Sequence, residues 1–433
     1  MSSALKELTD WIPTMRWPAG VLLACALAAH GGVQAQAQGA AGKPADKGAA
    51  AEAPAEAVRV ELGAIFQKVQ DLLKTGNAPG ALTALADAEK LENRTPFENL
   101  SINRVRGSVA LVARDFALAR RSLEATVADP RLSPADKRAA LQGLVVSTQR
   151  LNDHAAAVRH AREFFAAGGQ GEAMKGAMVR SLFAVKNWAG VAQETPALVQ
   201  EIEAAGRKPD EELLKIWATA LAESKNDAAY FQAIEALVRH HPSPDYWGDL
   251  LSRLQNRPGF ADRLILDAYR LMRRTESMTD DTEYAGMAQL AVQAALPGEA
   301  VAVLDEGFKA SVLGKGPQAA AHRDLRARAA KAAADDRAQL AQSEASAEKS
   351  GDAWRVFTVG EAALSYGQTD KGLALMEKAI AQGLKRNAED ARLRYGVALL
   401  QAGRRPQAEA ILKTVQGADG AADLARLWLL AVR

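Results

Sequence analysis

From about Val58 to the C-terminus, apolar residues recur at helical spacing, and short polar turns separate the segments. Apolar residues that return every three or four positions line one face of an amphipathic helix. Alternating runs rich in valine, isoleucine, threonine and aromatic residues, which would indicate strands, are scarce. Alanine dominates the apolar set, and it is the best helix former. The pattern therefore predicts an all-α chain.

The clearest repetition lies in the C-terminal part of the chain, where two units carry small or apolar residues at the same offsets, 36 residues apart. These residues are Gly360, Gly367, Gly372, Met376 and Ala379 in the first unit, and Gly396, Gly403, Ala408, Leu412 and Val415 in the second. Glycine ends a helix readily because it adopts a positive φ. Small residues let two helices approach closely where they cross. The pattern predicts units of helix, turn and helix.

Weaker copies of this unit lie upstream. Predicted turns at Gly76, Arg114, Asn152 and Lys186 follow one another at intervals of 38, 38 and 34 residues. Each turn leads into a second helix with small or apolar residues on one face. A recurring spacing of this length is typical of solenoids.

These motifs resemble the tetratricopeptide repeat (TPR) family, whose unit of about 34 residues is a pair of helices. The resemblance covers most of residues 58–433 and is strongest at 352–416. It implies a right-handed α-solenoid with a concave face that binds protein or peptide partners. An irregular all-helical domain is the alternative.

Three parts are expected after the N-terminal segment. Residues 58–240 form TPR-like repeats, 241–313 an irregular helical joint with one TPR-like unit, and 314–433 the C-terminal repeats with a capping helix. Pro242-Ser243-Pro244 must interrupt a helix. The sequence near Ala334-Asp335 is expected to split residues 314–350 into two helices, with a loose linker as the alternative.

Residues 1–37 have the order of a secretory signal peptide. Arg16 precedes an apolar run from Trp17 to Ala29, and small residues follow. Cleavage after Ala35 or Ala37 would release the chain into the periplasm. The next segment, 38–57, contains alanine, glycine, proline, lysine and glutamate but no large apolar side chain, which predicts a flexible linker.

Two alternatives concern the same N-terminal segment. Cys25 follows Leu22-Leu23-Ala24, which loosely resembles a lipobox, so Cys25 could carry a lipid and make the protein an outer-membrane lipoprotein. The segment could also remain as an anchor. Translation from Met15 would give a more compact signal. Cys25 is the single cysteine of the chain, so a chain cleaved at Ala35 has no disulfide and no cysteine-based zinc site.

The charge of the chain is nearly balanced, with 54 lysines and arginines against 52 acidic residues. A net charge of +2 gives no case for a nucleic-acid partner. The basic clusters Arg270, Arg273 and Arg274, and Arg404 and Arg405, are expected on solvated helix faces.

No motif predicts catalysis, a metal or a cofactor. The HExxH motif, the phosphate-binding glycine loops and the G-x-S-x-G elbow are absent. The carboxylate pairs Asp280-Asp281 and Asp335-Asp336 are interpreted as charges at helix N-termini. Trp217 and Trp247 are expected to pack in the core, with a role as partner anchors as the alternative.

One set of residues is predicted to contact a partner. In the TPR family the first helix of each unit lines the concave groove. With Gly360 in the middle of such a helix, the family resemblance implies that four side chains face the groove: Trp354, Phe357, Glu361 and Leu364. The alternative is that Trp354 and Phe357 pack against the preceding pair of helices.

The predicted function is a non-catalytic scaffold for protein–protein interaction in the bacterial periplasm. In arrangement and in its C-terminal pattern, the chain is similar to periplasmic repeat proteins that accompany TonB-type energy-transduction systems. The alternatives are an outer-membrane lipoprotein scaffold for envelope assembly or polysaccharide export, and an enzyme acting on cell-wall glycan.

Overall fold

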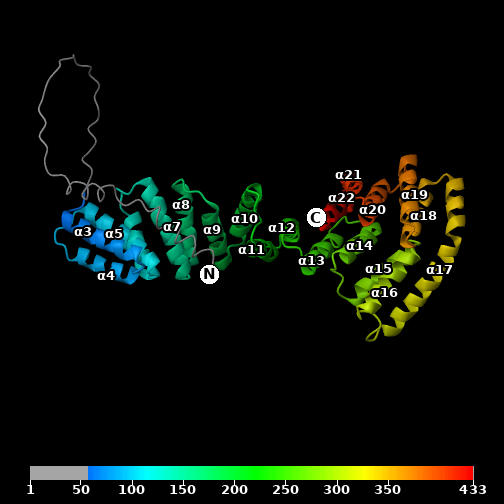
Figure 1. Ribbon diagram of the computed structural model, residues 1–433, viewed down its shortest axis with the longest axis horizontal. Coiled ribbons are helices and arrows are strands. Elements are labelled where there is room, and N and C mark those ends of the chain that lie inside the picture. Colours follow the sequence, from blue (N-terminus) through cyan, green and yellow to red (C-terminus); the bar gives the residue numbers. More distant parts are fainter. Residues whose placement is uncertain (1–56, 433) are drawn as a thin grey trace, which may run out of the picture. The chain divides into compact units, whose positions relative to one another are not determined.

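The computed structural model describes residues 57–432 of the chain. In this range the chain has twenty α-helices and no strand, which confirms the predicted all-α fold class (Figure 1). The predicted signal peptide at 1–37, the possible lipidation site Cys25 and all but the last residue of the linker at 38–57 lie outside the described residues. None of the described helices combines the length and the apolar character needed to cross a bilayer.

The chain forms two compact units. The N-terminal unit extends to Pro209 and includes Thr219–Ser224, and the C-terminal unit contains Asp210–Ala218 and the chain from Lys225 onward. Helix α11 (Glu211–Glu223) contains the division.

The N-terminal unit is a stack of helical pairs. Its helices are α3 (Val60–Lys74), α4 (Ala78–Glu89), α5 (Pro96–Val112), α6 (Phe116–Val127), α7 (Pro134–Arg150), α8 (His154–Ala166), α9 (Glu172–Ala184) and α10 (Trp188–Ala204). Consecutive helices pack on one another, and the first helices of successive pairs, α3, α5, α7 and α9, also contact in sequence order. This arrangement is that of an α-solenoid.

The turn within each pair follows one local rule. The predicted turn residues Gly76, Arg114, Asn152 and Lys186 have φ values of 76°, 60°, 59° and 56°, which confirms their position. The residue after each turn residue is asparagine or aspartate, and its side chain accepts a hydrogen bond from a backbone N–H of the second helix. A left-handed residue followed by an N-cap therefore ends one helix and starts the next.

The C-terminal unit continues with further helices. They are α12 (Asp227–His240), α13 (Pro244–Gln255), the 3₁₀ turn η2 (Asp262–Leu264), α14 (Ile265–Arg274), α15 (Asp281–Gln293), α16 (Pro297–Lys309), α17 (Ala319–Ser350), α18 (Ala353–Ser365), α19 (Thr369–Gln382), α20 (Ala388–Gln401), α21 (Arg405–Leu412) and α22 (Ala421–Ala431). The predicted break at Pro242–Pro244 is confirmed, since α13 begins at Pro244.

The two strongest predicted repeats are the pairs α18–α19 and α20–α21. Gly367 and Gly403 end their first helices with φ values of 76° and 74°. Gly360 and Gly396 lie where the paired helices cross, and a Cβ atom at Gly360 would lie 2.9 Å from the carbonyl oxygen of Gly372. Both predicted roles of glycine are confirmed.

The prediction for residues 314–350 is wrong. Residues 319–350 form one continuous helix, α17, rather than two helices or a linker. No glycine or proline interrupts this segment, and its alanines favour uninterrupted helix. Asp335 and Asp336 therefore lie in the middle of a helix and not at an N-terminus, whereas Asp280 is the N-cap of α15 as expected.

Candidate functional site

The C-terminal unit folds back so that the segment from Arg257 through α14 meets the last helix, α22. Helix α14 contacts α22, and α20 contacts α22 as well. The backbone N–H of Ala261 donates to the carbonyl oxygen of Asp419 over 2.9 Å, and Arg257 pairs with Asp423. The ring of Phe260 packs so closely on Gly420 that a side chain there would have no room. These contacts join the last helix of the unit to α14 and the segment before it, and so close this part of the solenoid.

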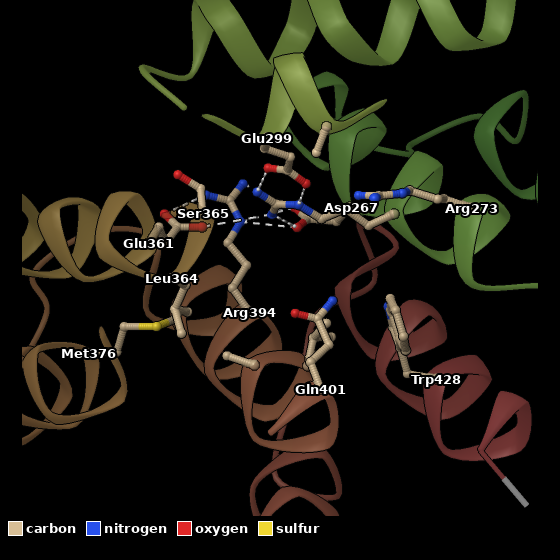
Figure 2. Close-up of a pocket in the computed structure, with 14 residues that line it drawn as sticks. Asp267, Arg273, Glu299, Glu361, Leu364, Ser365, Met376, Arg394, Gln401 and Trp428 are labelled. Carbon is tan, nitrogen blue, oxygen red and sulfur yellow. Dashed lines mark hydrogen bonds and ion pairs between the residues drawn. The ribbon is translucent and has the colours of Figure 1, made fainter. Parts of the chain in front are cut away.

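A cavity of about 230 Å³ lies in this unit, between α14, α16, α18, α19, α20 and α22 (Figure 2). Its lining includes Asp267, Arg270, Glu299, Glu361, Arg394 and Trp428. Among the described residues, no group of histidine, cysteine, aspartate and glutamate is arranged to hold a metal ion.

Five of these residues form what we call the buried charge cluster: Asp267, Arg270, Glu299, Glu361 and Arg394. Four helices supply them, α14, α16, α18 and α20. On α14 the residues Asp267 and Arg270 are three positions apart and so share one face of the helix. Leu266 and Leu271 of the same helix are buried in the core, which fixes that face toward the cavity.

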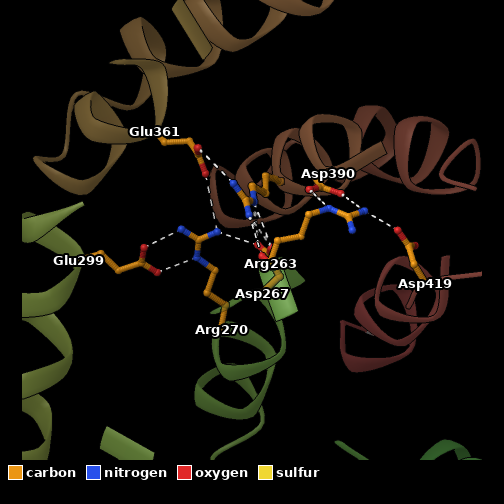
Figure 3. A network of polar contacts seen from close by, with 8 residues as sticks. Arg263, Asp267, Arg270, Glu299, Glu361, Asp390 and Asp419 are labelled. Atoms are coloured by element: carbon orange, nitrogen blue, oxygen red, sulfur yellow. Dashed lines mark hydrogen bonds and ion pairs between the residues drawn. The ribbon is translucent and has the colours of Figure 1, made fainter. Parts of the chain in front are cut away.

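Asp267 is at the centre of the cluster (Figure 3). Its carboxylate accepts a hydrogen bond of 2.7 Å from Arg270 and bonds of 3.0 to 3.1 Å from Nε and Nη2 of Arg394. Arg270 also donates two bonds, of 2.8 and 2.7 Å, to the carboxylate of Glu299. Burial alone would raise the pKa of Asp267, but the guanidinium groups of Arg394 and Arg270 outweigh burial and lower it. Asp267 is therefore an ionised link between α14 and α20.

Glu361 differs from the other carboxylates of the cluster. Its carboxylate lies 3.7 Å from Nη1 of Arg270 and 3.6 Å from Nη1 of Arg394, beyond hydrogen-bond distance. Its side chain is 7% exposed, and burial raises its pKa above the ordinary value for glutamate. Glu361 is thus the carboxylate of the cluster whose charge is least compensated.

A second ion-pair group joins the same segments beside the cavity. Arg263 donates to the buried Asp390 over 2.8 Å and also pairs with Asp419 (Figure 3). It connects η2 to α20 and to the segment that precedes α22.

Trp428 of α22 contributes an apolar ring and one polar atom to the lining of the cavity. Its ring rises from α22 toward the cavity (Figure 2) and is only 1% exposed. Its indole Nε1 is buried and has no hydrogen-bond partner. Because an unpaired buried N–H donor costs free energy, this atom favours an acceptor from outside the chain.

The four residues predicted to line a groove divide into two pairs. Glu361 and Leu364 line the cavity. Phe357 is fully buried in the core of α18 and α19, and Trp354 stacks on it with ring centroids 5.5 Å apart. Phe357 therefore packs within the protein and is not free to contact a partner. Trp217 and Trp247 are buried as well, as expected for core residues.

The remaining residues of the cluster were missed. Arg270 was expected on a solvated face, but its side chain is only 12% exposed and is paired with two carboxylates. Its neighbour Arg274 is exposed as expected. The sequence does contain a signal that Arg270 is buried. Arg270 and Asp267 both lie on the apolar side of the short helix α14.

The C-terminal part of the unit is similar to a known repeat family. Residues 363–431 match the tetratricopeptide repeat family model. This confirms the predicted repeat type for α19 to α22 and the turn that precedes them. No curated protein matches the chain.

Two solved structures are among those similar to the chain. The structure of Naa15/Naa10 bound to HypK-THB is 13% identical, with 86% of this chain and 68% of that chain covered and a TM-score of 0.26. The crystal structure of yeast Tom70 is 11% identical, with 86% of this chain and 95% of that chain covered and a TM-score of 0.22.

Proposed function

We propose that this protein is a non-catalytic scaffold that binds other proteins in the bacterial periplasm. The observation that carries the proposal is the repeat match at residues 363–431, in a chain whose described part consists of stacked helical pairs. Solenoids of this kind bury their core between neighbouring units and bind partners on extended faces. Four charges of the cavity, those of Asp267, Arg270, Glu299 and Arg394, are occupied in mutual ion pairs that connect helices, which favours a structural or binding role over acid–base catalysis.

The periplasmic location in this proposal rests on the sequence of residues 1–37, with its basic residue, short apolar run and small residues before a cleavage site. The proposed partners are components of the cell envelope, with a TonB-type transport complex as the specific candidate. That candidate rests on the similarity of the overall arrangement: a signal, a linker and C-terminal repeats.

The location is tested by the intact mass of the protein recovered from fractionated cells. A soluble periplasmic chain beginning at Gln36 or Gln38 is the expected result. An acylated chain beginning at Cys25 in the membrane fraction would replace the soluble scaffold by an outer-membrane lipoprotein. An uncleaved chain in the cytoplasm would contradict both locations.

The scaffold role is tested by chemical crosslinking in intact cells, followed by affinity capture of the full-length protein and mass spectrometry. We expect one or a few envelope proteins in stoichiometric amounts, and the same proteins in a reciprocal capture. A protein that is captured alone under these conditions would contradict the scaffold role.

A further inference from the structure

The buried charge cluster carries an excess of negative charge. Two guanidinium groups, of Arg270 and Arg394, face three carboxylates, of Asp267, Glu299 and Glu361. A third guanidinium group of the lining, that of Arg273, is paired with Glu306 and so does not balance the excess. All five side chains are at most 15% exposed. An unbalanced buried charge is costly, so the cavity favours a compensating cation.

The excess charge is located at Glu361. Asp267 and Glu299 accept hydrogen bonds of 2.7 to 3.1 Å from the guanidinium groups, whereas the Glu361 carboxylate lies 3.6 Å or more from both. Glu361 lines the cavity, beside the space that a cation would enter.

The cavity also offers one donor that the chain leaves unpaired. Nε1 of Trp428 has no partner, although the side chain is almost completely buried. An indole N–H can only donate, so the ligand must present an acceptor beside its cationic group. Glu361 and Trp428 point toward the cavity from α18 and α22 (Figure 2).

The size of the cavity limits the ligand. Its volume of about 230 Å³ is below the roughly 300–1,000 Å³ of ordinary small-molecule pockets. Gln401 and Arg273 line the cavity and are also accessible to solvent, which gives it an open side. The space suits one long side chain that enters from outside.

We propose that this cavity binds a lysine side chain of a protein partner, with the ammonium group on Glu361 and a backbone carbonyl of the same partner accepting from Trp428 Nε1. Lysine fits better than arginine for two reasons. A compact ammonium group needs only one carboxylate. The space beside Glu361 is already occupied by the guanidinium groups of Arg270 and Arg394. This inference rests on the proposed scaffold function and names the chemistry that the partner must carry.

The test uses the full-length protein with tryptophan labelled by ¹⁵N. The chain from Gln38 onward has five tryptophans, each with one indole N–H signal in nuclear magnetic resonance spectra, and the Trp428→Phe variant assigns the signal of Trp428. The probe is Nα-acetyl-lysine N-methylamide, and Nα-acetyl-norleucine N-methylamide is the uncharged control of similar length. We expect the lysine probe, but not the control, to shift the Trp428 signal in a saturable way.

The Glu361→Gln variant keeps the shape of the side chain and removes the excess charge. We expect it to keep its melting temperature and to bind the lysine probe at least about tenfold more weakly. Equal binding by this variant, or equal binding of the norleucine control, would overturn the proposal. Pentylamine tests the other source of an ammonium group: binding as tight as that of the lysine probe would show a site for free amines and would also overturn the proposal.

These outcomes are independent of the scaffold experiment. If crosslinking captures a partner but the lysine probe leaves the Trp428 signal unchanged, the cavity inference fails and the scaffold function stands. If neither experiment gives binding, both fail.

Discussion

At the scale of single residues, the main finding is that charged side chains connect helices that are far apart in the sequence. Asp267 and Arg394 are separated by 127 positions and are joined by hydrogen bonds of 3.0 to 3.1 Å. Burying charges opposes folding, and the pairing offsets much of that cost only when each charge has a partner. Replacing different members of the cluster should therefore have different effects on the free energy of unfolding.

Replacement of Arg394 by methionine should destabilise the C-terminal unit by about 3–5 kcal/mol, since it leaves one guanidinium group against three buried carboxylates. Glu361→Gln should change the free energy of unfolding by less than about 1 kcal/mol, or increase it. The substitution leaves two guanidinium groups facing two carboxylates, so no buried charge is unpaired. Urea unfolding of the two variants and the wild type measures this. Equal losses for both variants would contradict the assignment of the excess charge to Glu361.

A second residue-scale prediction concerns the N-terminal unit. The carboxylate of Glu98 accepts hydrogen bonds of 2.8 and 2.9 Å from Arg59, and these bonds, together with backbone N–H groups, lower the pKa of Glu98 to about 2. A lowered pKa means that the stabilisation is present above the ordinary value of 4.5 and is lost as the pH falls toward 2.

Glu98→Gln should therefore cost about 1–3 kcal/mol at pH 7, and the difference from wild type should shrink as the pH falls below 4.5. Urea midpoints of both proteins between pH 7 and pH 3 measure the trend. A difference that stays constant or grows toward low pH would contradict the interpretation.

At the scale of elements, most of the structure could be predicted. The glycines at 360 and 367, and their counterparts at 396 and 403, fixed the two C-terminal pairs because their roles are local: one small residue at a crossing and one positive φ at a turn. The long helix α17 was missed for an equally local reason, since a charged dipeptide inside an alanine-rich segment does not stop a helix without glycine or proline.

The crossing at Gly360 gives a prediction for this scale. Gly360→Ala should destabilise the C-terminal unit by about 1–3 kcal/mol, because the new methyl group would lie 2.9 Å from the Gly372 carbonyl oxygen and would force α18 and α19 apart. Gly248→Ala is the matched control in helix α13, where the nearest atom would be 3.7 Å away. The control should be neutral or stabilising by up to about 1 kcal/mol. Thermal unfolding compares the two, and equal effects would argue against close packing at the crossing.

At the scale of the whole molecule, the sequence predicts less. The repeat pattern describes each helical pair and its neighbours. The closure of the C-terminal unit depends instead on contacts between residues far apart in the sequence, such as Ala261 and Asp419, which no local pattern connects. The cavity exists because of this closure, so only Glu361 and Leu364 of its lining could be foreseen. The N-terminal unit, a solenoid whose described residues from 57 onward show no comparable long-range ion-pair group, was the easier part to predict.

We propose that this protein holds a partner protein and that the C-terminal cavity takes part in that contact. The most direct test places a photo-crosslinking amino acid at Gln401, which lines the cavity and is exposed, and at Asp324 of α17, whose side chain is 66% exposed, as a control. Irradiation of living cells should give a discrete protein adduct at position 401 that is absent at 324 and is lost with Glu361→Gln. No adduct at 401, or the same adducts at both positions, would contradict the account.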